Sequence, residues 1–473
     1  MQEFLLNIVS KINGYLADYI LIILLIGTGL WFTIKTKFVQ VRCFGEGMRK
    51  VVGKFSLRGG KQQGGLSSFQ ALATAIAAQV GTGNIVGASG AILIGGPGAI
   101  FWMWVIAFLG MATIYSEAVL AQETREVDEN GEVRGGPVYY MKKAFPNGFG
   151  KFLAWFFAIA ATLALGFMGS MVQSNSIAET CNTAFGIPVW VIGIIVAAIA
   201  AFIFLGGIQR IASVTEKMVP FMAGFFLLGG LVILILRIQY IPETIGMIFK
   251  FAFTPSALIG GGIGYALKTA ISQGAKRGLF SNEAGMGSTP HAHAMAKVEK
   301  PHDQGVAAMI GVFIDTFVVL TMTALVVISC LYAGDGVLNA SLGSPNAYEA
   351  AKALAGISKT NAMQLAVTSA FPSLGNFGNI FVAICLFFFA FSTILSWNFF
   401  GKLNVQYMAG KKQKIAVVIY SIVAIGFIFL GSILQNDLVW ELTDFFNYLM
   451  VIPNVIALIA LSKLVIKNSK KDK

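Results

Sequence analysis

Charged side chains are scarce in this chain. Asp, Glu, Lys and Arg make up 12% of its 473 residues, whereas 56% are hydrophobic and the mean hydropathy is +0.75. A soluble globular domain carries about 25% charged residues, so the composition argues against a soluble protein. A basic segment and a small-residue cleavage site are also missing from the start, MQEFLLNIVSKING. We therefore expect no removable signal peptide.

Cysteine and histidine are rare, which limits metal and redox chemistry. The four cysteines are Cys43, Cys181, Cys330 and Cys385. They show no metal or redox spacing; a disulfide between the second and third is conceivable, with isolated small residues in helices as the alternative. The three histidines, His291, His293 and His302, share one loop that lacks further zinc ligands. We expect no cofactor.

Apolar sequence is what the chain has in abundance. Stretches of about 20 residues recur along it, each long enough to cross roughly 30 Å of hydrocarbon. We place them near 14–34, 67–90, 97–121, 152–178, 187–205, 212–236, 258–289, 306–332, 377–400, 413–433 and 438–463. The sequence therefore predicts an all-α polytopic membrane protein with about 11 transmembrane helices.

The basic residues predict how the chain sits in the membrane. If the loop at 35–66 faces the cytoplasm, most Lys and Arg side chains fall in inner loops, as the positive-inside rule requires. The outer side then holds only Lys11, Arg237, Lys250, Lys352 and Lys359. We expect a multi-pass protein of the cell membrane with its N-terminus outside and its C-terminus in the cytoplasm. The net charge of +12 is explained by this topology, so no nucleic-acid partner is expected.

The spans after the first divide into two matching halves. The stretch at 14–34 is an extra N-terminal helix, and the halves are 67–236 and 258–463, with five spans each. Each half opens with an apolar segment that glycine and polar residues interrupt. Because five is odd, the second half enters from the opposite side, which gives inverted repeats around a central site. We treat 1–473 as a single transporter domain.

The first interrupted segment contains AAQVGTGNIVG at 77–87. Its glycines do not fit the dinucleotide spacing G-x-G-x-x-G, and no strand precedes them, so a nucleotide site is excluded. Helix packing by small residues is the plain alternative. The polar residues Gln79, Thr82 and Asn84 beside Gly81 and Gly83 favour an unwound segment instead.

An unwound segment in the bilayer exposes peptide groups that can bind charge. Free carbonyls from Ala77 to Val80 could coordinate a small hard cation. Free N–H groups from Gly81 to Gly83 could hold a carboxylate, aided by the helix dipole. Thr82 and Asn84 would add side-chain oxygens.

The second interrupted segment is TAISQGAKRGLFSNEAG at 269–285. We predict its break at Ser272 to Ala275, which makes Ser272, Gln273 and Gly274 candidate substrate-binding residues. The cations Lys276 and Arg277 should then pair with Glu283 or another carboxylate toward the cytoplasmic side.

A later span, 377–400, carries the adjacent hydroxyls of Ser392 and Thr393, and Trp397 follows one turn later on the same face. Hydroxyls in a helix often only bond back to the carbonyl four residues earlier. Together with carbonyls of the first break, however, they could complete a neutral-ligand sodium site. Gln173 could reach the central cavity or bond to a neighbouring helix. Glu117, Lys268 and Asp315 are further ionisable groups within spans, and such groups suggest function.

Long motifs in the chain resemble those of the alanine or glycine:cation symporter family (sodium:alanine symporters). They are GGPGAIFWMWVIAFLG at 95–110, QVGTGNIVGA, SQGAKRGLFSNEAGMGS and STILSW. The resemblance implies the leucine-transporter-like 5+5 inverted-repeat fold. It also implies sodium-coupled uptake of small neutral amino acids, chiefly alanine and glycine, with no enzyme activity.

The resemblance also implies roles for single residues. Ala77 and Val80 look like backbone ligands of sodium, with Ser392 and Thr393 as its hydroxyl ligands. The implied substrate contacts are Gln79, Thr82, Gly83, Asn84, Gln173, Ser272 and Trp397, the last of which would wall the side-chain end. The alternatives are a proton-coupled carrier using Asp315 or Glu117, a preference for glutamine or serine, a membrane-embedded enzyme, and a channel.

Overall fold

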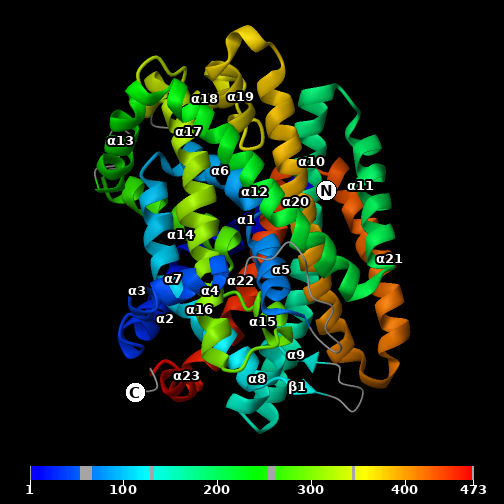
Figure 1. Cartoon of the computed structure of the whole chain (residues 1–473). Coiled ribbons are helices and arrows are strands. Elements are labelled where there is room, and N and C mark those ends of the chain that lie inside the picture. The colour runs from blue at the N-terminus through cyan, green and yellow to red at the C-terminus, as the bar shows by residue number, and fades with distance from the viewer. Residues whose placement is uncertain (1, 54–65, 128–132, 254–262, 344–346, 471–473) are drawn as a thin grey trace.

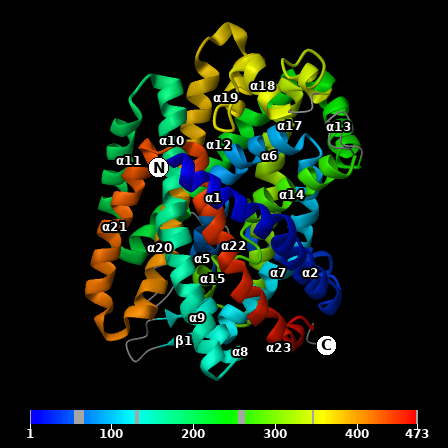
Figure 2. The same ribbon diagram turned by 180° about the vertical axis from the view of Figure 1, so that it is seen from behind.

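The computed structural model describes residues 2–53, 66–127, 133–253, 263–343 and 347–470. These residues form a bundle of long helices that run broadly in one direction (Figure 1). The C-terminus lies at one end of the bundle, with α8 (Pro137–Ala144) and α23 (Ser462–Asn468). The opposite end holds α18 (Ala347–Ala355) and α19 (Ala362–Ala370) (Figures 1 and 2). We call these the C-terminal end and the α19 end.

The first half of the chain begins with one long helical stretch and continues into the first interrupted segment. The stretch is α1 (Gln2–Tyr15), the π-helical η1 (Leu16–Leu21) and α2 (Ile22–Lys35), followed by α3 (Val39–Arg42) and α4 (Phe44–Gly53). Then come α5 (Ser68–Gln79), η2 (Gly83–Gly87), α6 (Ala88–Gly95) and α7 (Ala99–Glu123). A short antiparallel hairpin of β1 (Glu126–Val127) and β2 (Val133–Arg134) leads to α8.

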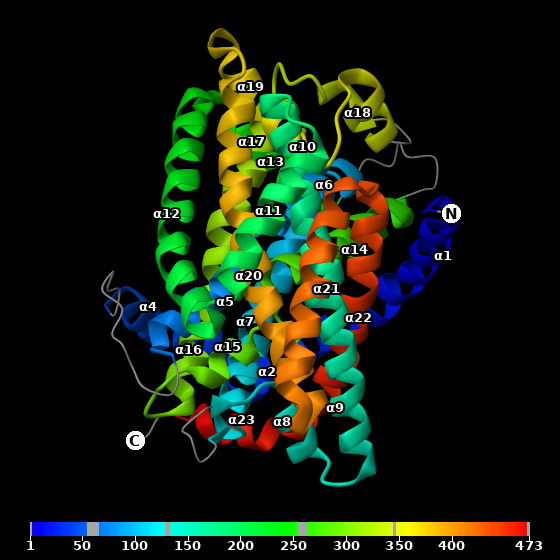
Figure 3. The same ribbon diagram turned by 90° about the vertical axis from the view of Figure 1, so that its right-hand side faces the viewer.

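The central part of the chain supplies the long helices on either side of the second interrupted segment. They are α9 (Gly148–Ala161), η3 (Thr162–Gly169), α10 (Ser170–Phe185), α11 (Val189–Phe204), α12 (Gly207–Leu236), η4 (Ile238–Tyr240), α13 (Ile241–Phe253), α14 (Ile263–Asn282), α15 (Pro290–Met295), α16 (Pro301–Val312), η5 (Phe313–Leu320) and α17 (Thr321–Leu331). In Figure 3, α12 stands on the opposite flank of the bundle from α9 and α22.

The last part of the chain contributes the helices that enclose the centre. After η6 (Asn339–Gly343), α18, α19 and η7 (Pro372–Leu374), the helices are α20 (Phe377–Ala409), η8 (Gly410–Lys412), α21 (Gln413–Ile433), α22 (Asn436–Ala460) and α23. The long α20 packs against both α5 and α10. It therefore stands beside α5, the first half of the first interrupted segment.

Hydrophobic length confirms a polytopic helical membrane protein. Among the described residues, seven helical stretches are long and apolar enough to cross a membrane, and the pair Ser68–Gln79 and Gly83–Gly95, bent by 43°, makes an eighth. Large apolar side chains on the outside of the bundle, such as Phe202, Leu228 and Ile422, are exposed, as expected for a surface that faces lipid. The number of eleven spans remains a prediction, since α11 is a shorter apolar helix.

The first interruption lies where the sequence predicts it. A capping box between Ser67 and Gln70 starts α5, with each side chain bonded to the other's backbone N–H. The helix ends at Gln79, and Val80 leaves the helical region at φ −79° and ψ 86°. Helical backbone resumes at Thr82, with φ −55° and ψ −29°, and η2 begins at Gly83. The unwound residues are therefore 80–81, inside the predicted 77–87.

The predicted position of the second interruption is wrong. Residues 272–275 lie inside the continuous helix α14, and the chain unwinds at 283–289 instead. There Glu283, Gly285 and Gly287 adopt positive φ angles of 59°, 92° and 81°. Two glycines that tolerate this conformation, followed by Pro290 as the first residue of α15, explain why the helix stops here.

Gly274 has a different purpose from the one that the sequence suggested. A Cβ atom on it would lie 2.6 Å from Trp102 Cβ and 3.0 Å from the Ala99 carbonyl oxygen. The glycine therefore lets α14 and α7 approach closely, as small residues do between membrane helices. Its helical neighbours keep α14 intact.

Three π-helical segments border the middle of the bundle: η2, η3 and η5. π-Helical turns often occur at functional sites, because the extra residue re-aims side chains and loosens the backbone ladder. Here η2 follows the first interruption, and η5 contains the buried Asp315. These segments point to the middle of the bundle as the functional region.

Candidate functional site

The two interruptions lie against each other. A Cβ atom on Gly83 would come within 3.0 Å of the Phe280 ring and 3.1 Å of Ser281 Cα, so only glycine permits this contact. Asp315 joins the two segments, because it accepts hydrogen bonds from Asn84 Nδ2 at 2.7 Å and from Ser281 Oγ at 3.0 Å. The two halves of the chain therefore meet at the centre with Asp315 between them, through Phe280 and Ser281 and not through the predicted break at Ser272 to Ala275.

The hydroxyls of α20 point at the end of α5. Thr393 Oγ1 lies 2.9 Å from the Ala77 carbonyl oxygen and 3.3 Å from that of Ala78. Ser392 Oγ lies 3.3 Å from the Ala77 oxygen. Both hydroxyls also bond back to the Phe389 carbonyl, at 3.2 and 2.9 Å. The structure thus contains both arrangements that the sequence allowed: local back-bonding and a cluster of neutral oxygens shared with the first interruption.

Glycine at position 81 is required by this close packing. A Cβ atom there would lie 2.3 Å from Thr393 Oγ1 and 3.2 Å from Gln173 Oε1. Val80, the other residue predicted to offer a carbonyl to sodium, caps α5 and donates its N–H to Ile76. The oxygen cluster is therefore held between α5 and α20 without a charged side chain among its members.

The backbone N–H groups of the first interruption donate hydrogen bonds to side-chain carbonyl oxygens. Gly81 N–H donates to Asn84 Oδ1 at 2.9 Å, and Thr82 N–H donates to Gln173 Oε1 at 3.0 Å. Thr82 Oγ1 donates to the same glutamine oxygen at 2.6 Å. Gln173 Nε2 is buried and has no partner within the described residues. The N–H groups predicted to hold a carboxylate therefore point at oxygen acceptors that can be exchanged for one.

Trp397 contacts Glu283, the first residue of the second interruption. Trp397 Nε1 donates to Glu283 Oε1 at 2.5 Å, and Ser288 Oγ donates to the other carboxylate oxygen. The indole packs edge-on against Phe280 at 5.6 Å, and a Cβ atom on Gly169 would meet it at 2.2 Å. A buried carboxylate with neutral partners is costly unless a cation arrives. Glu283 does not pair with Lys276 or Arg277, so that predicted alternative is wrong.

Glu117 holds the unwound part of the second interruption. Its carboxylate accepts the N–H groups of Gly285 and Gly287 at 3.1 and 3.0 Å, and Asn454 Nδ2 donates to it at 2.6 Å. Asn454 also donates to the Gly285 carbonyl at 2.9 Å and accepts from Tyr140. The peptide groups freed by unwinding are therefore satisfied by α7 and α22. Sequence reasoning noted Glu117 as an ionisable group but missed this role.

Three predicted site residues lie away from the interruptions. Ser272 donates to Asp18 on the first helical stretch at 2.5 Å, and Gln273 packs against Gly95. Since α14 rises about 1.5 Å per residue, Ser272 is roughly 16 Å along the helix from Glu283. The structure therefore does not bring Ser272, Gln273 or Gly274 to the centre. Gln79, by contrast, lies close to the second interruption, because its side-chain amide donates to the Asn282 carbonyl at 2.8 Å.

The cations of α14 pair with carboxylates on the α19 side of the second interruption, not on the side toward the C-terminal end, where the sequence predicted their partners. Arg277 forms a buried two-pronged pair with Asp444, at 2.7 and 3.4 Å, and lies over the Trp440 ring at 4.7 Å. Lys276 and Lys268 approach Asp18 at 3.5 and 3.1 Å. Trp440 in turn packs against Phe280 at 4.7 Å. An ion pair and three aromatic rings, those of Trp440, Phe280 and Trp397, thus stack from the α19 side down to the centre.

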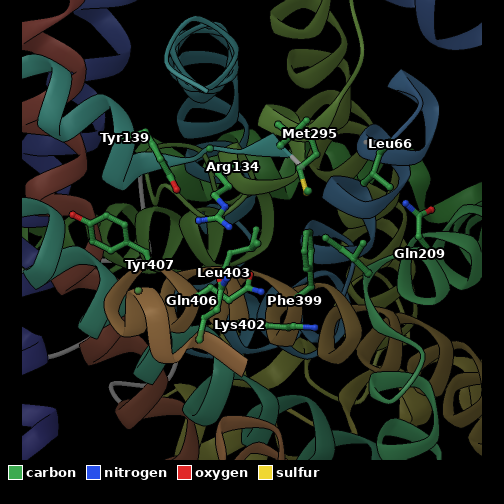
Figure 4. Close-up of a pocket in the computed structure, with 15 residues that line it drawn as sticks. Leu66, Arg134, Tyr139, Gln209, Met295, Phe399, Lys402, Leu403, Gln406 and Tyr407 are labelled. Atoms are coloured by element: carbon green, nitrogen blue, oxygen red, sulfur yellow. The ribbon is translucent and has the colours of Figure 1, made fainter. Parts of the chain in front are cut away.

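A cavity of about 460 Å³ lies on the opposite side, between the centre and the C-terminal end. Figure 4 shows Arg134, Met295, Phe399 and Lys402 around it. The cavity brings together Leu66, two residues before α5, Met295, the last residue of α15, and the second half of α20. The helices are therefore spread apart between the site and the C-terminal end, and packed tightly between the site and the α19 end.

The four cysteines do not pair with one another, and the three histidines do not share a site. All four cysteines are buried and none forms a disulfide, so the conceivable disulfide is absent. The three histidines have different hydrogen-bond partners: Asn404 at 2.9 Å for His291, Gln304 at 2.8 Å for His293, and Tyr115 at 2.7 Å for His302.

Comparisons with known proteins place this site in a family context. Residues 2–472 match the model of the sodium:alanine symporter family. The chain is 40% identical to the sodium/alanine symporter AgcS of Methanococcus maripaludis, over 98% of this chain and 96% of that protein. It is also 40% identical to YrbD of Bacillus subtilis, described as a putative sodium/proton-dependent alanine carrier, over 99% of this chain and 93% of that one.

A solved structure with low sequence identity shares the fold. The crystal structure of MhsT in complex with L-phenylalanine aligns with a TM-score of 0.57 at 14% identity, covering 87% of this chain and all of that one. At this identity the likeness speaks for the fold alone. It confirms the predicted leucine-transporter-like fold class.

Proposed function

The chain belongs to the sodium:alanine symporter family, and from that premise we propose that it couples sodium entry to the uptake of small neutral amino acids, alanine and glycine, across the cell membrane. The observation that carries this proposal is the meeting of two interrupted helices at the centre, with two hydroxyls of α20 facing the freed carbonyls of α5. Ion and substrate can bind side by side there.

The sodium ion binds between α5 and α20. A small hard cation prefers oxygen ligands, and a site of neutral oxygens does not need a compensating buried charge. The carbonyls of Ala77 and Val80 and the hydroxyls of Ser392 and Thr393 supply such oxygens from two separate helices. On ion binding the hydroxyls turn their protons away from Ala77 and offer lone pairs instead. The ion then fixes the distance between the two helices.

The substrate carboxylate takes the place of the oxygens of Asn84 and Gln173. The N–H groups at 81–83 stand at the start of η2 and α6, where the helix dipole favours an anion. A charged carboxylate forms stronger hydrogen bonds to these groups than a neutral amide does. The released Gln173 side chain can then use its unpaired Nε2 donor on the substrate.

The substrate ammonium is balanced by Glu283. This carboxylate is fully buried and receives hydrogen bonds from neutral donors, so an arriving ammonium group offsets its desolvation. Trp397 fills the neighbouring space and packs on Gly169 and Phe280, which leaves room for small side chains. The size limit therefore comes from α20, η3 and α14.

Transport proceeds by alternating access. The stack from Asp444 and Arg277 down to Trp397 closes the α19 side, while the cavity beside Arg134 and Lys402 opens toward the C-terminal end. Basic residues gather at that end, which supports a cytoplasmic C-terminus. Each sodium ion that crosses 100 mV supplies about 2.3 kcal/mol, or roughly 50-fold accumulation of substrate.

The test is sodium-dependent uptake of labelled alanine and glycine into proteoliposomes. We expect Thr393→Ala to raise the sodium concentration that gives half-maximal uptake by about tenfold, because a hydroxyl ligand is lost. Thr180→Ala is the matched control, since Thr180 is also buried and only bonds back along its own helix, to Ser176 at 2.8 Å. Uptake driven by a pH gradient without sodium, or an unchanged sodium dependence in Thr393→Ala, would refute the assignment.

A further inference from the structure

A cluster of potential metal ligands lies at the C-terminal end, away from the transport site. Cys43 follows α3, Glu46 lies on α4, and His302 lies at the start of α16. One ligand atom from each of the three lies within 4.8 Å of the other two. Sulfur, imidazole nitrogen and carboxylate oxygen are the three donor types that zinc uses in proteins.

The scaffold around the cluster is tightly packed. A Cβ atom on Gly47 would lie 2.8 Å from the Val306 carbonyl oxygen, so α4 is pressed against α16. One on Gly305 would lie 2.7 Å from the Tyr115 ring, which presses α16 against α7. Before α3, the left-handed conformations of Lys37 and Phe38 turn the chain and set the direction of the segment that carries Cys43. The ligands therefore come from elements whose relative positions are fixed.

Tyr115 orients His302 for metal binding. Tyr115 OH lies 2.7 Å from His302 Nδ1 and donates to the Asn468 carbonyl oxygen at 3.3 Å. When its single proton is on the Asn468 carbonyl, the hydroxyl accepts a hydrogen bond from His302 Nδ1–H, and Nε2 keeps a lone pair for a metal ion. Such an outer partner on the second ring nitrogen is typical of metal-binding histidines.

The distance between His302 and Glu46 is unusual for a hydrogen bond. His302 Nε2 lies 3.4 and 3.5 Å from the two oxygens of Glu46, whereas a charge-assisted hydrogen bond is about 2.7–2.9 Å. In a tetrahedral site with bonds of about 2.1 Å, neighbouring ligand atoms stand about 3.4 Å apart. The two groups are therefore spaced as ligands of one ion.

The surroundings allow access and leave one Glu46 oxygen for the ion. Lys50 Nζ lies 3.0 Å from Glu46 Oε1 and is itself paired with Asp303, which offsets its charge. Oε2, which lies 3.5 Å from His302 Nε2, is the oxygen left for the ion. Glu46 and His302 border a surface cavity of about 640 Å³, which provides a path for an ion from solvent.

We propose that Cys43, Glu46 and His302 bind one zinc ion, with water as the fourth ligand, and that this ion ties α4 to the ends of α16 and α7. The mixed sulfur, nitrogen and oxygen set disfavours sodium, magnesium and calcium, which take oxygen ligands. The spacing of cysteines or histidines along the sequence did not reveal this site, because its ligands come from segments more than 250 residues apart.

The test is metal binding by the purified full-length protein, after chelation, with cobalt and zinc as probes. We expect one cobalt ion per chain with a thiolate-to-cobalt charge-transfer band, and displacement of the cobalt by zinc. Cys43→Ser should remove the band, and His302→Gln should weaken binding at least tenfold. Tyr115→Phe should weaken it about 10-fold to 100-fold, through loss of the orienting hydrogen bond. Cys330→Ser is the control, because Cys330 is equally buried but lies in α17.

Sodium-dependent uptake shows that each variant is folded. Should Cys43→Ser fail to fold, a zinc-induced rise in the thermal unfolding temperature of the unmodified protein, lost in His302→Gln, gives an independent measurement. Substoichiometric cobalt in the unmodified protein, or a charge-transfer band that persists in Cys43→Ser, would overturn the proposal.

Discussion

Both interrupted helices leave backbone N–H groups without helical partners, and the two find hydrogen-bond acceptors for them in different ways. At the first interruption, neutral side chains accept the freed N–H groups: Asn84 from its own segment and Gln173 from α10. At the second, the carboxylate of Glu117 accepts two N–H groups that lie within three residues of each other. Neutral, exchangeable acceptors suit a place where a ligand comes and goes. A buried charge with several fixed partners suits a joint that must hold its shape.

The difference also indicates that the first interruption serves to bind ligands and the second serves to hold the central helices in place. The first interruption keeps a short gap and resumes as a π-helical turn, with Gly81 pressed against Thr393 of α20. The second is longer, passes through two glycines with positive φ, and is joined to α7 and α22. We infer that ion and substrate affinity depend mainly on the first interruption, and that the integrity of the central fold depends mainly on the Glu117 side of the second.

The largest effect is expected from removing the carboxylate that supports the second interruption. Glu117→Ala leaves the N–H groups of Gly285 and Gly287 buried without acceptors, at about 1–3 kcal/mol each. We expect loss of uptake and a clear drop in the thermal unfolding temperature. Glu123→Ala, on the last turn of the same helix α7 and bonded only by the partly exposed Asn468, is the control. Normal uptake by Glu117→Ala would contradict the framework role.

A smaller but more selective effect is expected at the contact between the first interruption and α20. In Gly81→Ala the new Cβ atom would lie 2.3 Å from Thr393 Oγ1 and push the hydroxyl away from Ala77. The sodium concentration for half-maximal uptake should rise at least as much as in Thr393→Ala. Because Thr393→Ala removes the clashing oxygen, the two substitutions together should cost less than the sum of their separate effects.

The control for this coupling is Gly90→Ala, further along the same segment, where the new methyl group meets only the flexible side chain of Lys359 at 3.3 Å. Its sodium dependence should remain unchanged. Strict additivity of Gly81→Ala and Thr393→Ala would show that the two positions do not share the ion.

Gln173→Ala tests the exchangeable acceptor. The substitution removes the oxygen that holds Thr82 N–H and Oγ1, and also the free Nε2 donor. We expect KM for alanine to rise by about 5-fold to 100-fold, as for loss of one or two hydrogen bonds, with a smaller change in kcat. An equal fall in kcat and an unchanged KM would assign Gln173 to the helix framework instead.

Short-range signals were enough to predict the first interruption and the α20 hydroxyls, whereas the family resemblance implied that the two would meet. Gly81, Gly83 and the polar residues between them stand together in the sequence, and Ser392 and Thr393 are adjacent in an apolar helix. These features depend on composition within one or two turns. They remain recognisable whatever the rest of the chain does.

The errors came from features decided by distant partners. Gly274 resembles a helix break but is needed for contact with Trp102, and the nearby Ser272 donates to Asp18 on the first helical stretch. The true interruption at 283–289 had a local signal, the two glycines followed by Ser, Thr and Pro290. The role of Glu117 had none, because its partners lie 168 to 337 residues away in the sequence.

The smallest effect is expected at the position where the break was wrongly predicted, and α14 offers a matched pair to test it. Ser272→Ala removes one hydrogen bond to the partly exposed Asp18, so stability should fall by about 1 kcal/mol or less, with sodium and alanine affinities unchanged within twofold. Ser281→Ala makes the same chemical change beside the first interruption, where the hydroxyl donates to Asp315. It should weaken alanine binding several-fold, because Asp315 then loses part of its hold on Asn84. If the order of the two effects were reversed in uptake assays, the centre of the transport site would have to lie near Ser272 after all.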